Sequence, residues 1–156
     1  MDAIEVGALW LHTLAMVIVL GYYGILARVV LPALRKALDG EGLVAAVPAV
    51  ERRALPIVIL AIVLFIVTGV YLLVTGDQYT GIGDFSNTWS TMMLVKHLVI
   101  VGMIALGVAV DRLARAVGDT SDEGLPQALD VLALAAEATM VLGVIVLLLT
   151  AIAQLA

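Results

Sequence analysis

Apolar residues form four long runs along the chain, separated by shorter segments rich in charged residues, glycine and proline. The runs lie near residues 6–30, 55–75, 91–110 and 131–154. Crossing the hydrocarbon core of a bilayer takes about 20 apolar residues, and each run reaches that length. Because backbone polar groups in lipid have to be satisfied within their own segment, we expect each run to form a transmembrane helix.

The composition agrees with this interpretation. Of the 156 residues, 63% are hydrophobic and 13% are charged, whereas a soluble domain is about 45–50% apolar and about 25% charged. The segments between the runs are short, which favours antiparallel neighbours. The sequence therefore predicts an all-α protein, with residues 1–156 forming a single up-down-up-down bundle of four transmembrane helices in contact with the lipid bilayer.

Charge and cysteine content exclude several classes of protein. The formal net charge of −5 argues against binding to nucleic acid, which requires a basic surface. The absence of cysteine excludes thiolate metal sites, iron–sulfur clusters and covalently attached haem. Non-covalent cofactors remain compatible with the sequence.

The distribution of basic residues predicts the orientation in the membrane. Seven of the eight basic residues lie at or beyond the ends of the first and third runs: Arg28, Arg35, Lys36, Arg52, Arg53, Arg112 and Arg115. The positive-inside rule then places loops 31–54 and 111–130 in the cytoplasm and both termini outside the plasma (inner) membrane. We expect a short interfacial helix near residues 37–47 and a turn-rich outer loop over residues 76–89.

The only two histidines, His12 and His97, both lie within apolar runs. The first and third runs cross in the same direction, so both imidazoles are expected roughly 6–9 Å below the outer boundary. Diagonal helices in such a bundle are about 11–14 Å apart, a gap that suits a flat macrocycle with a ligand on each face. A b-type haem is one interpretation, and hydrogen bonding across helix interfaces is the other.

Three further residues at a similar depth fit a haem site. Thr68 and Gly69 in the second run are expected to leave a notch for the edge of a porphyrin. Lys96, the one basic residue in the outer half, either extends to the outer headgroups or pairs with a haem propionate or another anion.

A copper site would use the same histidines with two methionines. His12 and Met16 are four residues apart, as are Met93 and His97, so each pair shares one face of a helix. Thioether and imidazole ligands together suit Cu(I). Methionine is also a common gap-filling residue in apolar helices, which is the structural alternative.

Glu137 is an acidic residue within the fourth run. A carboxylate at this depth needs a partner, and Arg28, Arg53 and Arg112 are expected at the same end of the bundle. We interpret it as one half of a structural ion pair, with a proton or cation route as the alternative.

Short motifs spread over most of the chain resemble those of known membrane proteins. They are Trp10-Leu11-His12, Glu51-Arg52-Arg53, Thr68-Gly69, and Trp89 followed by Lys96. This pattern resembles the copper-resistance-D membrane family and the related HemJ-type protoporphyrinogen oxidases. The resemblance implies that His12 is a haem b ligand and that Lys96 is required for function.

Together these observations predict a membrane protein that holds one haem b between the first and third spans. His12 and His97 would be the axial ligands, and Lys96 would pair with a propionate. The expected role is electron transfer or haem-dependent oxidation, alone or with a redox partner in a larger complex. Copper binding or transport and a non-catalytic membrane anchor remain the alternatives.

Overall fold

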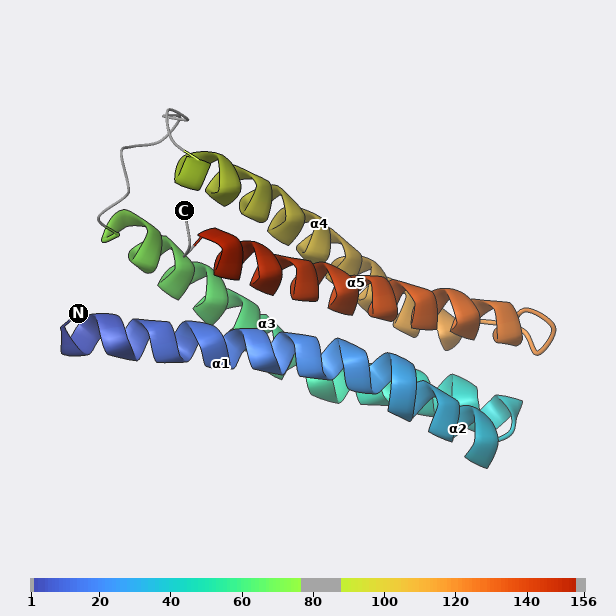
Figure 1. Cartoon of the computed structure of the whole chain (residues 1–156). Helices are drawn as coiled ribbons and strands as arrows, with labels where there is room; N and C mark the ends of the chain where they lie inside the picture. The colour runs from blue at the N-terminus through green and yellow to red at the C-terminus, as the bar shows by residue number, and fades with distance from the viewer. Residues whose placement is uncertain (1, 77–87, 154–156) are drawn as a thin grey trace.

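The computed structural model describes residues 2–76 and 88–153, which form four long helical rods packed side by side (Figure 1). Every regular element within these two ranges is helical and none is a strand. The prediction of an all-α four-helix bundle is therefore confirmed. The elements in chain order are α1 (Ala3–Ile25), η1 (Leu26–Val30), α2 (Leu31–Ala37), α3 (Gly40–Val74), α4 (Thr88–Val117) and α5 (Leu125–Ala153).

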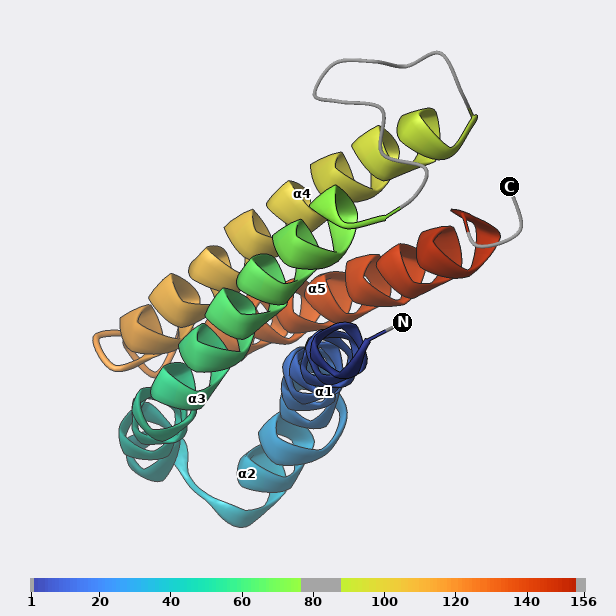
Figure 2. The same ribbon diagram turned by 90° about the vertical axis from the view of Figure 1, so that its left-hand side faces the viewer.

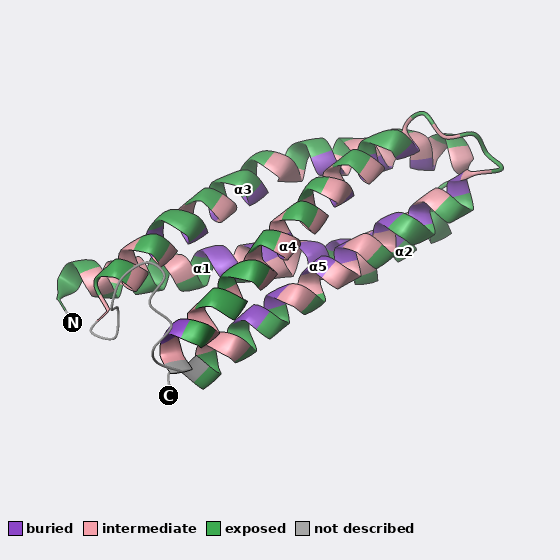
Figure 3. Cartoon of the chain, turned by 90° about the horizontal axis from the view of Figure 1, so that it is seen from above, coloured by how far each residue is buried: buried purple, intermediate pink, exposed green. Residues whose placement is uncertain are grey.

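All four rods are long and apolar enough to cross a membrane, the first consisting of α1, η1 and α2 together. Large hydrophobic side chains cover their outer surfaces, and buried residues lie mainly along the sides that face neighbouring helices (Figure 3). Trp10, for example, is 63% exposed. A surface this apolar is suited to lipid rather than to water, so the chain is a multi-pass membrane protein.

Successive rods pack next to one another and close into a four-membered bundle. Contacts join α1 to α3, α3 to α4, α4 to α5, and α5 back to α1. The helices α1 and α4 are therefore diagonal, as the sequence predicts for the first and third spans. Figures 1 and 2 show that α1 and α4 diverge toward the end of the bundle at which α1 begins.

The two ends of the bundle differ in charge. We call the end at which α1 begins and α5 finishes the terminal end, and the opposite end, which contains α2, the basic end (Figure 1). Six basic residues lie in the elements and turns of the basic end: Arg35, Lys36, Arg52, Arg53, Arg112 and Arg115.

The helices extend far beyond the predicted spans, and the loop prediction for residues 31–54 was wrong. Only Leu38 and Asp39 separate α2 from α3. The Asp39 side chain accepts a hydrogen bond from the backbone N–H of Gly42 at 2.8 Å and so starts α3 just after the turn. Consequently Pro56 lies inside a 35-residue helix and not in its first turn.

The other connections also differ from expectation or fall outside the described residues. Residues 111–130 were expected to form a loop, but α4 continues to Val117 and α5 starts at Leu125. The helices continue because their inward positions remain apolar beyond the predicted spans, as at the buried residues Val117 and Leu129. Most of the predicted outer loop (77–87) and the predicted end of the fourth span at Gln154 lie outside the described residues.

Candidate functional site

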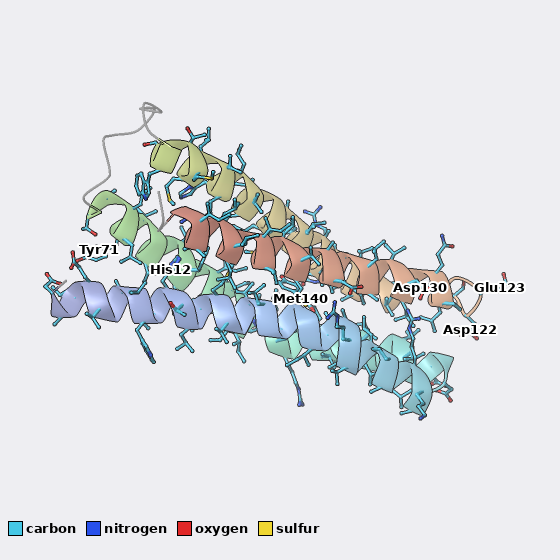
Figure 4. All side chains as sticks on the ribbon, viewed as in Figure 1. His12, Tyr71, Asp122, Glu123, Asp130 and Met140 are labelled. Atoms are coloured by element: carbon cyan, nitrogen blue, oxygen red, sulfur yellow. The ribbon has the colours of Figure 1, made fainter. Side chains whose placement is uncertain are left out.

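His12 of α1 lies against α3 at the terminal end of the bundle (Figure 4). Its Nδ1 atom is 3.0 Å from the carbonyl oxygen of Phe65 and 3.0 Å from Oγ1 of Thr68. The imidazole also stacks on the Phe65 ring, with the centroids 4.3 Å apart and the planes inclined by 18°. Three contacts from one helix therefore fix the position and tilt of the ring.

These contacts also select the tautomer of His12. The carbonyl oxygen of Phe65 can only accept a hydrogen bond. Thr68 donates its single hydroxyl hydrogen to the carbonyl oxygen of Leu64 at 2.6 Å, so its oxygen is available as an acceptor. Both contacts are satisfied when Nδ1 of His12 carries the hydrogen. In the neutral ring, the lone pair then lies on Nε2, the nitrogen that can bind a metal.

Gly69 makes room for the imidazole. A Cβ atom built at this position would lie 2.9 Å from Cε1 of His12, closer than real Cβ contacts allow. The notch at Thr68 and Gly69 was expected to accept the edge of a porphyrin, but it contains the His12 ring itself. The reason is that the ring has to approach α3 closely to reach the backbone carbonyl of Phe65.

The neighbouring residues Lys96 and His97 of α4 differ in their surroundings. Lys96 is half-buried and interacts electrostatically with His12. His97 is exposed, and its Nδ1 atom lies 2.6 Å from the carbonyl oxygen of Met93 in its own helix. Successive residues in a helix point about 100° apart, so the two side chains cannot share one direction. Lys96 is thus within electrostatic range of His12, whereas His97 is bonded to its own helix.

The two methionines of the copper interpretation also lie in different surroundings. Met16 is buried in the core and 3% exposed, whereas Met93 is half-buried on α4 beside the exposed His97. Within residues 2–76 and 88–153, no group of three or more His, Cys, Asp or Glu side chains is placed to hold a metal ion.

Glu137 of α5 pairs with one of the three arginines that the sequence offers as partners. Its Oε1 atom lies 2.8 Å from Nη2 of Arg28, with the two side chains 47% and 61% exposed. Arg28 belongs to the π-helical segment η1, where the N–H of Leu31 donates to the carbonyl oxygen of Leu26. Pro32 follows and lacks the N–H that would bond the carbonyl of Arg28, which favours a local change of helical pitch.

Sequence reasoning missed a second polar contact between α1 and α3, near the basic end. Glu51 is only 5% exposed, and its Oε2 atom accepts a hydrogen bond from the hydroxyl of Tyr22. No pattern in the sequence marks its burial, because the lipid-facing positions of α3 are apolar as well. The buried residues of α3 follow one another at intervals of three, four or seven: Leu43, Val47, Glu51, Val58, Ala61, Phe65 and Thr68.

An open cavity of about 780 Å³ lies between α3 and α4 beside Glu51. On the α4 side it is lined by Asp111 and Arg115, whose side chains form an ion pair with an N–O distance of 2.7 Å. We call this cavity the α3–α4 groove. His12 lines neither this groove nor a second cavity of about 610 Å³ between the start of α3 and the start of α5.

Comparison of the chain with protein-family models, with curated proteins and with solved structures finds no match in any of the three. The resemblance to the copper-resistance-D and HemJ-type proteins therefore rests on the short sequence motifs alone and stays a prediction. The geometry around His12 is independent of that resemblance.

Proposed function

We propose that the chain is a membrane haem b protein in which Nε2 of His12 is an axial ligand of the iron. The observation that carries this proposal is the hydrogen bonding of the His12 imidazole. Nδ1 is held by the carbonyl of Phe65 and the hydroxyl of Thr68, which leaves Nε2 as the ligating atom. Metal-bound histidines typically donate their other N–H to such a partner, which fixes the ring and raises its basicity.

Lys96 is the candidate partner for a haem propionate. It is the half-buried cation that interacts electrostatically with His12, and an anionic group nearby would compensate its charge. His97 is the candidate for the second axial position. It is exposed and bonded to its own helix. Replacing it tests whether the iron has one histidine ligand or two.

Haem b would supply one-electron chemistry at its iron. The proposed role is electron transfer or haem-dependent oxidation, with a redox partner protein or within a larger membrane complex. By the positive-inside rule, the basic end would face the cytoplasm. The haem would then lie near the outer face of the plasma membrane, and both termini would be outside.

The test is an absorption spectrum of the detergent-purified protein, expressed with ample haem, before and after reduction by dithionite. We expect a Soret band in the wild type and its loss in His12→Ala. His97→Ala on the diagonal helix tests the second histidine separately. Sharp reduced bands in the wild type that are lost in His97→Ala would indicate two histidine ligands, whereas unchanged bands would leave His12 as the only histidine ligand.

A Soret band that is unchanged in His12→Ala would contradict the proposal. A wild-type protein without haem would also contradict it, and two alternatives would then remain. Stoichiometric Cu(I) binding that falls in Met16→Leu and Met93→Leu would favour copper binding or transport. Binding of neither cofactor would leave a membrane anchor, in which the His12 contacts only join α1 to α3.

A further inference from the structure

We propose that Glu51 is a proton-binding site, served by water in the α3–α4 groove. This site does not depend on haem, because its residues lie near the basic end and include none of the proposed haem ligands. The ligand is a proton exchanged with the aqueous phase at that end of the bundle.

The first support is the burial of the carboxyl group without a charged partner. Glu51 is 5% exposed, and no salt bridge to it occurs in the described parts of the chain. Its hydrogen-bond partner is the hydroxyl of Tyr22, which donates to Oε2. A buried carboxylate with one neutral donor is costly, and binding a proton removes that cost.

The charges around Glu51 come from each helix packed against α3. On α4, Asp111 and Arg115 are close enough to act on it electrostatically. Arg115 donates to Asp111 through Nε at 2.9 Å and through Nη2 at 2.7 and 2.8 Å, so its charge is largely compensated. On α1, the facing groups are the neutral phenols Tyr22 and Tyr23.

The remaining nearby charges lie on α3 itself, where Arg52 lines the α3–α4 groove. Arg52 and Arg53 are exposed, and neither forms a salt bridge with Glu51 among the described residues. Among the described residues, the cation that acts on Glu51 from another helix is Arg115, and its charge is shared with Asp111.

The second support is the composition of the groove that reaches Glu51. Two prolines of α3, Pro48 and Pro56, line it together with Val44 and Arg52. Each proline lacks the N–H that would bond the carbonyl four residues earlier, namely those of Val44 and Arg52. Carbonyls freed in this way in membrane proteins are tolerated where they line a water-filled cavity.

Further polar groups extend the groove to the basic end. Asp111, Arg115 and Asp119 line its α4 side, and the side chain of Asp119 is exposed. The groove thus provides polar atoms at intervals from the exposed end of α4 to the buried carboxyl. Water in it can deliver a proton to Glu51 and accept it again by the same route.

The hydrogen bond from Tyr22 is compatible with both protonation states. The ionised carboxylate accepts it at Oε2, and the protonated carboxyl can accept it through its carbonyl oxygen. Binding of the proton adds one hydrogen to Glu51 and removes one negative charge from the interior, with no other bond broken.

The test is infrared spectroscopy of the purified protein in the region of the protonated carboxyl C=O stretch, recorded over a range of pH. At neutral pH, we expect a band that is lost in the isosteric variant Glu51→Gln. The matched control is Glu137→Gln, which removes a partly exposed carboxyl that is paired with Arg28. This control should leave the band in place.

Two further measurements test the hydrogen bond and the access route. In Tyr22→Phe the band should persist but shift to higher frequency, because a C=O group that loses a hydrogen bond stiffens. Transfer to D2O should shift the band to lower frequency promptly, since the groove is open. A band that stays unshifted in D2O would overturn access through the groove.

Absence of the carboxyl band at neutral pH would overturn the proposal, and so would a band that survives in Glu51→Gln. If Glu51→Gln failed to fold, the frequency shift in Tyr22→Phe would still identify the carboxyl, and an unshifted band would contradict the assignment. None of these measurements involves haem, so failure of the haem proposal would leave the Glu51 proposal intact.

Discussion

Polar contacts join α1 to α3 in both halves of the bundle. In the terminal half, His12 of α1 meets Thr68 of α3. In the basic half, Tyr22 of α1 meets Glu51 of α3. Both α3 residues are buried and lie at inward positions of the same helix, yet the two contacts favour different chemistry.

The two contacts differ in which atoms remain free to bind a ligand and in which side chains of α4 act on them. The His12 contact uses one ring nitrogen and leaves the other for a metal, with the cation Lys96 on α4 acting on the ring. The Glu51 contact leaves a carboxyl that can bind a proton, beside a compensated Asp111–Arg115 pair. Under the two proposals, similar packing would serve a ligand site in one half and a proton site in the other, because the atoms left free differ.

The largest expected effect is the loss of the proposed haem site in His12→Ala. Without the imidazole, Phe65 and Thr68 lose their shared donor, and the iron loses its proposed ligand. We expect nearly complete loss of bound haem, measured as haem per protein by the pyridine haemochrome assay. Retention of stoichiometric haem would show that the His12 contact is merely structural, and the contrast between the two halves would then disappear.

The next effect is that of Gly69→Ala, which places a methyl group 2.9 Å from Cε1 of His12. The ring has to move away from Phe65, with an overpacking cost of about 1–3 kcal/mol. We expect a lower midpoint of thermal unfolding and reduced haem content. Gly21→Ala is the control, because a Cβ there meets nothing within 4 Å, and equal effects of the two variants would contradict the close packing.

A smaller effect is expected for Thr68→Val, which keeps the shape of the side chain but removes one of two acceptors of the His12 Nδ1 hydrogen. The carbonyl of Phe65 remains as an acceptor, so haem affinity should fall by about tenfold, at the lower end for supporting residues of metal ligands. Haem titration of the apoprotein measures this. Thr139→Val is the control, since that buried hydroxyl donates only to Ala135 of its own helix at 2.8 Å, and an equal loss in both variants would refute the positioning role.

The smallest effect is expected for the ion pair between Arg28 and Glu137. Both side chains are about half exposed, and pairs of this kind contribute about 0.2–1 kcal/mol. A double-mutant cycle with Arg28→Ala and Glu137→Ala, followed by thermal unfolding in detergent, gives the coupling energy. A coupling far above this range would mean that the pair is shielded from water, as the two contacts between α1 and α3 are.

The four helices and their order in the bundle were predictable from the sequence, whereas the helix ends and the contacts between side chains were not. The four apolar runs predicted four helices and the diagonal relation of α1 to α4, but not the helix ends, because amphipathic turns continue beyond the apolar runs. His12 was recognisable as an unusual polar residue in an apolar run. Its contacts with Phe65 and Thr68 lie more than fifty residues away in the chain, so no local pattern marks them.

The sequence by itself determined that lipid is the solvent, that four helices form, and that basic residues gather at one end. Only the tertiary structure decided that Lys96 is within electrostatic range of His12, that Gly69 accommodates an imidazole, and that Glu51 is buried. The physical reason is that a membrane-spanning helix is apolar on its lipid-facing side as well as on its packed side. Hydrophobic periodicity therefore fails to mark the inward positions, which are set by how the helices pack.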